Sequence, residues 1–276
     1  MLNRASKPFV KLVERYLPDP YIFVLLLTLI TFAFAVVIQN QSPLTTIQQW
    51  GDGFWGLLTF SMQMLLVLVT GFMLACTPLV KSLLERLASL AKSPGSAIVL
   101  VTLVSLIASW INWGFGLVVG ALFAKALARK VSVDYRLLVA SAYSGFIVWH
   151  GGLAGSVPLT IATPGHFSEA QIGVIGTGET IFSGFNLLLL AIMFVIIPLV
   201  NRLMLPPESE SIIVDSAKLQ DDALPSPTNE RPADKLENSK VLGLLVGFAG
   251  LAYLTNYFVS GGGLNLNIVN TLFLFL

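Results

Sequence analysis

Long runs of apolar residues are the feature that most constrains this chain. Tyr21–Ile38 holds 18 residues without a charge, and further apolar runs cover 54–77, 185–205 (with Arg202 near its end) and 241–259. A helix of 18 residues is about 27 Å long, close to the thickness of the hydrocarbon core of a bilayer. The runs therefore predict several membrane-spanning helices.

The composition excludes a water-soluble protein. Hydrophobic residues make up 55% of the chain and charged residues only 11%, whereas soluble domains carry about 25% charged residues. A net charge of +1 gives no reason to expect a nucleic acid partner. The single Cys76 excludes a disulfide framework and a multi-cysteine metal site, and we expect no cofactor. The chain is predicted to be an all-α polytopic protein whose surroundings are the lipid bilayer.

One hydrophilic segment divides the chain. Residues 206–240 hold eight acidic and four basic side chains together with five prolines, and show no helical apolar period. This composition predicts a solvated, largely disordered linker. It separates a long hydrophobic block, 1–205, from a short one, 241–276. The last apolar stretch, 268–276, is too short to cross a bilayer as a helix.

Two apolar regions are interrupted by glycine and polar residues. Ala97–Ala128 is broken at Asn112–Gly116, and Leu137–Ala162 is broken at His150–Ser156. The breaks divide these regions into pieces of roughly 12–15 residues, which is too short to span alone. We therefore expect the second region, 137–162, to be a broken helix.

The positions of Lys and Arg predict the orientation. Basic residues occur in the N-terminal segment and in 78–96, 125–136 and 202–240, but not in 40–53, 163–184 or 260–267. Because basic loops stay in the cytoplasm, the N-terminus is predicted to be cytoplasmic. Both ends of 97–128 are basic, so this region should enter and leave on the same side as a re-entrant hairpin. Two tightly turned full spans are the alternative, disfavoured by the short pieces.

Several other features have simple interpretations. The first apolar run could be a signal peptide, but the polar residues after it offer no cleavage site. Lys81–Leu90 fits an amphipathic helix or a cytoplasmic loop. His166 is expected at the surface. Asp52, Glu169 and Glu179 flank spans, and the five tryptophans lie near span ends or breaks, where interfacial or packing roles suffice.

The two breaks are the candidate functional site. Irregular backbone at membrane depth persists only where protein or a watery cavity surrounds it. In secondary transporters such breaks face the substrate, with helix N-termini directed at anionic groups. Glycine allows a ligand to approach the backbone closely, and an asparagine offers donors and an acceptor. The predicted substrate-binding residues are Asn112, Trp113, Gly114, Gly116, His150, Gly151, Gly152, Gly155 and Ser156.

Two alternatives remain open at these positions. The glycines could instead allow close packing of helices. His150 could relay protons, or it could be a neutral side chain bonded to a backbone carbonyl.

The energy source is constrained by absences in the sequence. No Asp or Glu lies inside a predicted span, so coupling would use His150 for H⁺, or Na⁺ held by carbonyls with Asn112 or Ser156. There is no phosphate-binding loop for ATP. Ser156 with His150 is the only pair that suggests hydrolysis, and it lacks a carboxylate to orient the histidine. We therefore do not expect an enzyme.

A set of short motifs resembles one family of carriers. The motifs are Leu17–Pro20, Trp50–Trp55, Ile111–Gly116, Trp149–Gly152, Gly155–Ser156 and Phe182–Asn186. Together they resemble the short-chain fatty acid transporter family over essentially the whole chain.

This resemblance implies a multi-pass carrier of the bacterial cytoplasmic (inner) membrane that transports small monocarboxylates such as acetoacetate or butyrate by ion-coupled symport. The family is grouped with the ion transporter superfamily, which implies two inverted repeats, elevator-type movement and a homodimer. Residues 1–205 would form the first repeat.

The chain departs from the family in length. Members are considerably longer, and a second repeat with its own glycine-rich hairpin should follow the linker. We therefore expect 241–276 to be the start of a truncated second repeat. The alternative function is a truncated, transport-inactive remnant of such a carrier.

Overall fold

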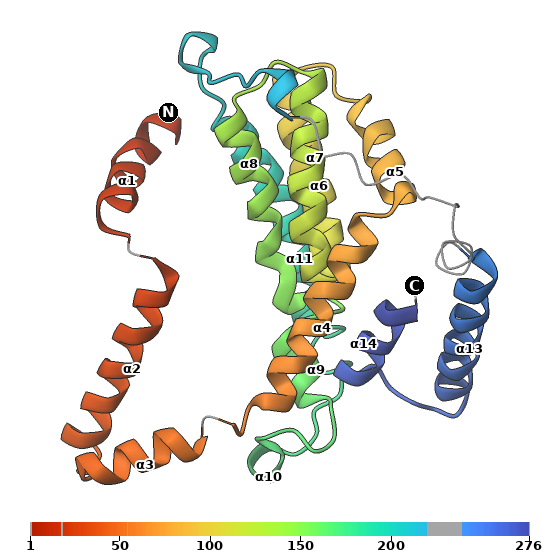
Figure 1. The fold of residues 1–276 in the computed structure, drawn as a ribbon. Helices are drawn as coiled ribbons and strands as arrows, with labels where there is room; N and C mark the ends of the chain where they lie inside the picture. The colour runs from red at the N-terminus through yellow and green to blue at the C-terminus, as the bar shows by residue number, and fades with distance from the viewer. Residues whose placement is uncertain (1, 18, 54, 220–238, 276) are drawn as a thin grey trace, which may run out of the picture. The chain divides into compact units, whose positions relative to one another are not determined.

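The computed structural model describes residues 2–17, 19–53, 55–219 and 239–275, and all regular secondary structure within these ranges is helical. The chain divides into two compact units, Met1–Met62 and Gln63–Leu276. The prediction of an all-α polytopic protein is confirmed (Figure 1).

The first unit contains three helices, and their ends follow from the local sequence. Pro20 occupies the first turn of α2, and the carboxylate of Asp19 accepts a hydrogen bond from the N–H of Tyr21 at 2.9 Å. Between α2 and α3, Asn40 adopts a positive φ of 53°, a conformation that asparagine tolerates. The helices are α1 (Leu2–Tyr16), α2 (Pro20–Val37) and α3 (Pro43–Gly53).

The second unit is built around a helical hairpin. Helices α6 (Pro94–Ile111) and α7 (Trp113–Lys130) are joined by Asn112 alone. Gly116 lies against Ser109, and Gly120 lies against Ser105, so the two helices run antiparallel from the turn.

The hairpin was predicted from the break at Asn112–Gly116, but its legs are longer than expected. Each helix has 18 residues, about 27 Å, rather than 12–15. The predicted legs were too short because Asn112 bonds to an N–H group of α7 and to a C=O group of α6 at the turn. Both helices therefore continue up to the break. Leg length therefore no longer separates a re-entrant hairpin from two full spans.

Two further helices pack beside the hairpin. Helix α4 (Leu58–Ala75) approaches its tip, and a Cβ added to Gly114 would lie 2.8 Å from the Cα of Leu68. Helix α5 (Pro78–Ala88) buries Leu84 and Ala88 in the core that it shares with α7. Lys81–Leu90 is thus largely an amphipathic helix rather than a loop. Its Glu85 is paired with Arg129 and Lys130 at 2.6 and 3.2 Å.

The predicted broken helix is also present. It consists of α8 (Tyr135–Ser144), the 3-10 helix η1 (Gly145–Gly151), a turn, and α9 (Ser156–Ile161). The helix departs from α geometry at Gly145, earlier than the predicted His150. A Cβ at Gly145 would lie 2.6 Å from the backbone carbon of Ser105, so glycine lets η1 lie close to α6.

The segment 163–184 and the helix that follows it complete this part of the unit. Helix α10 (Glu169–Ile172) is short, and α11 (Gly184–Leu203) packs on α6. Asn201 of α11 donates hydrogen bonds to the hydroxyl groups of Thr102 at 3.1 Å and Ser144 at 2.8 Å, joining α11 to α6 and α8.

The expectation of disorder is wrong for the described part of the linker, 206–219. The carboxylate of Asp134 accepts hydrogen bonds from the N–H of Ile212 at 2.8 Å and from Arg136 at 2.8 Å. The side chain of Leu219 is buried. Most of the segment is exposed, as its composition predicted, but a buried acceptor and an apolar contact hold it on the folded bundle. Residues 220–238 lie outside the described residues.

Five helices within the described residues are long and apolar enough to cross a membrane. They include α4, α6, α11, α13 (Lys240–Val259) and the combined segment Tyr135–Ile161. Helix α14 (Leu266–Phe275) and Tyr21–Val37 of α2 are shorter apolar helices.

Candidate functional site

The two breaks predicted from the sequence contact each other. The N–H of Leu153, in the turn after η1, donates a hydrogen bond of 2.7 Å to the carbonyl of Trp110 in the last turn of α6. A Cβ added to Gly152 would lie 2.9 Å from the Cα of Trp110. The break in the second region is therefore fixed to the tip of the hairpin by a backbone hydrogen bond and close packing.

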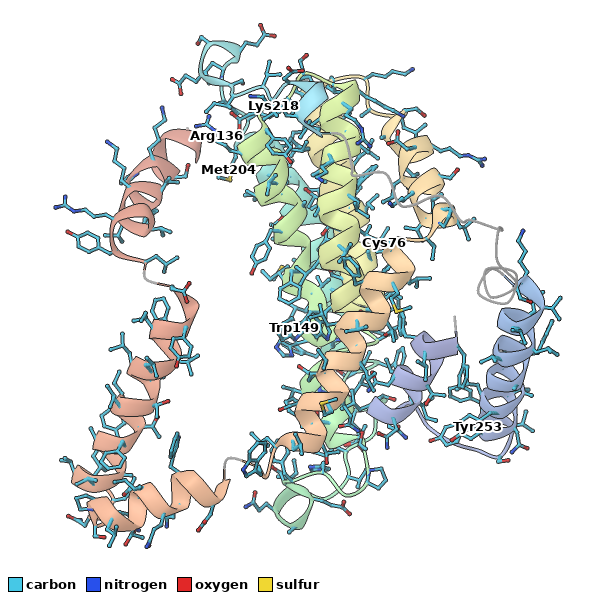
Figure 2. All side chains as sticks on the ribbon, in the orientation of Figure 1. Cys76, Arg136, Trp149, Met204, Lys218 and Tyr253 are labelled. Atoms are coloured by element: carbon cyan, nitrogen blue, oxygen red, sulfur yellow. The ribbon has the colours of Figure 1, made fainter. Side chains whose placement is uncertain are left out.

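Aromatic side chains surround this junction. The ring centroid of Trp149 lies 5.6 Å from that of Trp113, 4.4 Å from that of Phe146 and 4.3 Å from that of His150. Trp149 lies about midway along the helical bundle of this unit (Figure 2). The rings form an apolar cluster at the junction, which we call the aromatic cluster (Trp113, Phe146, Trp149 and His150).

Asn112 is at the centre of the hairpin tip and is fully buried. Its Oδ1 accepts a hydrogen bond from the N–H of Phe115 at 3.0 Å, which caps α7, while its backbone N–H bonds to the carbonyl of Ala108 at 2.9 Å. Its Nδ2 has no hydrogen-bond partner in the described structure. A buried donor without a partner is costly, so Nδ2 is a candidate for an acceptor that the described residues do not supply.

Trp149 supplies a second unpartnered donor. Its indole Nε1 is buried and makes no hydrogen bond within the described ranges. From the sequence we assigned Trp149 to packing or to a membrane interface, because tryptophan is common at both places. Only the tertiary structure shows that its N–H is withdrawn from solvent beside the hairpin tip.

Asn186 of α11 is another residue that the sequence analysis did not select. Its Nδ2 donates to the carbonyl of Gly151 at 3.1 Å and to that of Ile181 at 2.7 Å. It thereby satisfies a backbone acceptor that the break leaves without a helical partner. The motif Phe182–Asn186 was noted for the family resemblance, but its spacing could not show which carbonyl groups Asn186 contacts.

The glycines of the site are close-packing positions in this structure. An added Cβ would lie within 3.0 Å of α4 backbone at Gly114, and of Ser109 backbone at Gly116. At Gly155 it would lie close to the carbonyl of His150, and at Gly151 close to the amide of Asn186. The packing alternative thus accounts for these contacts, and a role of these glycines in binding stays a prediction.

His150 and Ser156 differ in exposure. The His150 ring is exposed and makes no hydrogen bond to the described part of the chain, which removes the alternative of a histidine held by a backbone carbonyl. Ser156 is buried in the first turn of α9.

Within the described ranges, no three His, Cys, Asp or Glu side chains are grouped as metal ligands would be.

Asn270 of α14 carries further unpartnered polar atoms. Its side chain is buried, and neither Oδ1 nor Nδ2 finds a partner among the described residues. The neighbouring Asn267 accepts a hydrogen bond from Gln63 of α4 at 2.6 Å, and the N–H of Leu266 donates to Thr163, just after α9, at 3.1 Å. Helix α14 is thus joined both to α4, which covers the hairpin tip, and to the end of the broken helix.

The expectation that His166 is a surface residue is wrong. The side chain is 9% exposed; its Nδ1 accepts from the N–H of Ser168 at 3.2 Å, and its Nε2 lies 3.1 Å from the carbonyl of Gly173. Through these two contacts the ring ties the two ends of a turn together. Its position in the sequence predicted an exposed loop residue, but the loop packs around the side chain of His166.

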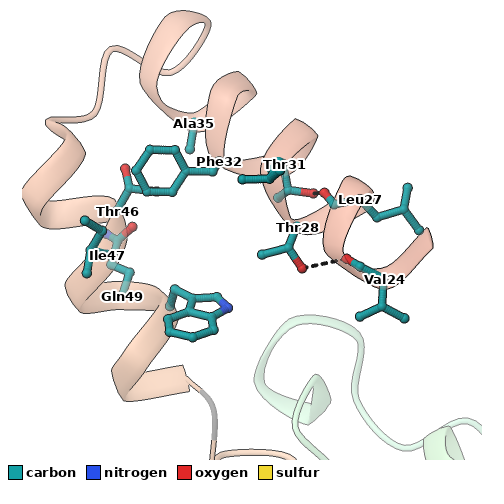
Figure 3. Close-up of a pocket in the computed structure, with 11 residues that line it drawn as sticks. Val24, Leu27, Thr28, Thr31, Phe32, Ala35, Thr46, Ile47 and Gln49 are labelled. Atoms are coloured by element: carbon teal, nitrogen blue, oxygen red, sulfur yellow. Dashed lines mark hydrogen bonds between the residues drawn. The ribbon is translucent and has the colours of Figure 1, made fainter. Parts of the chain in front are cut away.

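A pocket of about 680 Å³ lies elsewhere, between α2 and α3 in the first unit. Its lining includes Val24, Phe32, Ile47 and Trp50 (Figure 3). The lining is mostly apolar, with Thr28, Thr31, Thr46 and Gln49 as its polar members, and it carries no charged side chain.

Comparison with known proteins identifies the group to which the chain is related. The profile of the family described as "Short chain fatty acid transporter" matches residues 1–276. The chain belongs to this family. No solved structure matches it.

Two curated members of the family illustrate the relationship. A protein of Escherichia coli K12 is 45% identical over 279 residues, covering 99% of this chain and 63% of the relative. A protein of Haemophilus influenzae Rd is 41% identical over 290 residues, covering 99% and 64%. Both carry the name "Putative short-chain fatty acid transporter". The chain thus spans somewhat less than two thirds of the length of these relatives.

Proposed function

We propose that this chain is part of a secondary transporter of short-chain fatty acids, small monocarboxylates such as acetoacetate or butyrate, and that it binds the carboxylate at the junction of the two breaks. The observation that carries the proposal is the pair of buried, unpartnered donors at this junction, Nδ2 of Asn112 and Nε1 of Trp149. An ionised carboxylate only accepts hydrogen bonds, so it complements two donors.

Two further features support a carboxylate at this position. Helix α7 begins at Trp113, and the N-terminus of an 18-residue helix carries partial positive charge. The aromatic cluster offers an apolar surface of the kind that a short alkyl chain would contact. Binding would therefore need no lysine or arginine inside the spans.

The movement and the coupling are proposed from the family resemblance. We expect elevator-type movement in a homodimer of the bacterial inner membrane with a cytoplasmic N-terminus, coupled to Na⁺ or H⁺. Na⁺ would be held by backbone carbonyls with Asn112 or Ser156, and H⁺ would be carried by the exposed His150. Replacing Na⁺ by choline, against a protonophore control, distinguishes the two ions.

The test uses two substitutions that remove a donor, the first isosteric and the second with a smaller ring. Asn112→Asp retains an oxygen that can cap α7 but places a negative charge where Nδ2 was, and Trp149→Phe retains an aromatic ring without the N–H. Binding of butyrate to the purified chain should weaken roughly tenfold or more in each, because a hydrogen bond to a charged group contributes about 1.5–3 kcal/mol. Trp55→Phe, at an exposed tryptophan, is the control.

Uptake of labelled butyrate into vesicles is measured on the same proteins. Unchanged binding in both Asn112→Asp and Trp149→Phe would refute the site. Binding without uptake would support the site and favour the alternative that the 276-residue chain is transport-inactive.

A further inference from the structure

Helix α1 has two chemically distinct faces. Phe9, Leu12, Val13 and Tyr16 follow the i, i+3, i+4, i+7 spacing of a single helical stripe, and between 48% and 69% of each side chain is exposed. Exposing a contiguous apolar stripe to water is costly, which indicates an interaction surface. We call it the apolar stripe of α1.

The other face of α1 is cationic. Lys7, Lys11 and Arg15 are spaced by four residues, which places them along one side of the helix. The sequence of α1 also includes Arg4. Glu14 is the only acidic residue in α1, so four positive charges and one negative charge leave a net charge of +3. The guanidinium of Arg15 lies 5.6 Å from the centre of the Tyr16 ring.

The covalent connection places α1 near a membrane surface. Only Leu17, Pro18 and Asp19 separate its last residue, Tyr16, from α2, which begins at Pro20. Three residues span about 10 Å at most when extended. Because α2 is an apolar helix of 18 residues in a membrane transporter family, its entry point into the bilayer is within that distance of α1.

We propose that α1 lies in the headgroup layer of the membrane, with the apolar stripe facing the acyl chains and the basic side chains bound to anionic lipid headgroups. The positive charge of the polar face favours anionic lipid over a second copy of α1 as the partner of this helix. A second copy of α1 would bring another +3 into contact, whereas an anionic headgroup layer attracts juxtamembrane lysine and arginine. The helix thereby holds the N-terminal end of α2 at a defined depth.

The experiment uses the whole chain carrying single environment-sensitive probes. Cys76 is the only cysteine, so Cys76→Ser provides a background in which Phe9→Cys or Lys11→Cys is labelled with an NBD fluorophore. The labelled proteins are reconstituted into vesicles of phosphatidylcholine alone or of phosphatidylcholine with phosphatidylglycerol. Quenching is measured with a nitroxide-labelled lipid and with iodide in the water.

In vesicles with phosphatidylglycerol, we expect the probe at position 9 to be quenched by the nitroxide lipid and protected from iodide, and the probe at 11 to remain accessible to iodide. Protection at 9 should decline in phosphatidylcholine alone and in high salt. Changing Lys7 and Arg15 to Gln in the Phe9→Cys protein should lower the docked-to-undocked ratio about fivefold for each charge removed.

Two outcomes would overturn the proposal. If the probe at 9 is protected equally in both lipids and in the charge variants, the apolar stripe is covered by protein. If both probes are accessible to iodide in vesicles with phosphatidylglycerol, α1 does not bind the membrane surface. Replacing Glu208, which is exposed and lies far along the sequence, by Gln is the control for a general change of charge.

Discussion

The N–H of Leu153 donates a hydrogen bond of 2.7 Å to the carbonyl of Trp110, and this bond joins the break in the second region to the tip of the helical hairpin. Neither partner is a polar side chain. The carbonyl of Trp110 lies in the last turn of α6 and the N–H of Leu153 lies in the turn after η1, where helices leave backbone groups without a helical partner. Gly152, which precedes Leu153, makes the approach feasible because it has no Cβ.

Gly152→Ala should therefore separate the two breaks. Its Cβ would lie within 3.0 Å of three backbone atoms of Trp110, which cannot move away without shifting α6. We expect a loss of about 1–3 kcal/mol in the free energy of unfolding, measured by thermal unfolding in detergent, together with weaker butyrate binding. Gly178→Ala is the matched control because no atom lies within 4 Å of its added Cβ. Equal stability of the two variants would contradict the contact.

Gly116→Ala should open the hairpin, and a compensating change in its neighbour should not restore it. The added Cβ would lie 2.5 Å from the backbone N and 2.5 Å from the Cα of Ser109. We expect a loss of about 1–3 kcal/mol in thermal unfolding experiments. Ser109→Gly removes the hydroxyl but leaves both backbone atoms, so the double variant should remain destabilised. Full recovery of stability would show that the side chain of Ser109 sets the spacing.

Asn186→Leu should loosen the segment after η1 while leaving the aromatic cluster in place. The substitution keeps the volume but removes the donor to the carbonyls of Gly151 and Ile181, each worth about 1 kcal/mol. Amide hydrogen exchange should accelerate in 151–155 and not in α5. Leu188→Ala, at an exposed position of the same helix, is the control. Unchanged exchange at 151–155 would mean that Asn186 does not hold the break.

Asp134→Asn should release the segment 206–219 from the bundle. One oxygen of Asp134 accepts from the N–H of Leu137, and the other accepts from Ile212 and Arg136. An amide cannot accept at both positions. We expect local opening to become easier by about 1–3 kcal/mol, seen as faster hydrogen exchange at 208–215, with Glu208→Gln as the control. Unchanged exchange would show that other contacts hold the segment.

The same carboxylate gives this contact a pH dependence. Burial raises the pKa of Asp134, but the hydrogen bonds from Arg136, Ile212 and Leu137 lower it by more, so its pKa in the folded protein is below the ordinary value. Stabilisation by Asp134 is therefore complete above the ordinary carboxyl pKa of about 3.9 and is lost as the pH falls below it towards the folded value. Exchange at 208–215 should accelerate in that acid range, and the acceleration should be absent in Asp134→Asn.

The sequence by itself determined the helical class, the positions of the apolar spans and the two interruptions. Hydrophobic runs and their breaks are local properties, and the cost of unpaired backbone in lipid restricts a long apolar run to a helix. Tyr21–Ile38 and Val241–Val259 were thus predicted within about two residues at each end. The two breaks at Asn112 and around Gly152 were located for the same reason.

Only the tertiary structure decided which atoms meet. The contacts of Leu153 with Trp110, of Asn186 with Gly151 and of Ile212 with Asp134 join residues 35 to 78 positions apart. The burial of the Trp149 N–H likewise depends on the packing of separate elements. The sequence predicted a surface histidine at 166 and a disordered segment at 206–219, and both expectations failed, although most of that segment is exposed to solvent. Burial and hydrogen-bond partners depend on the packing of distant elements, which residue type and spacing along one segment do not contain.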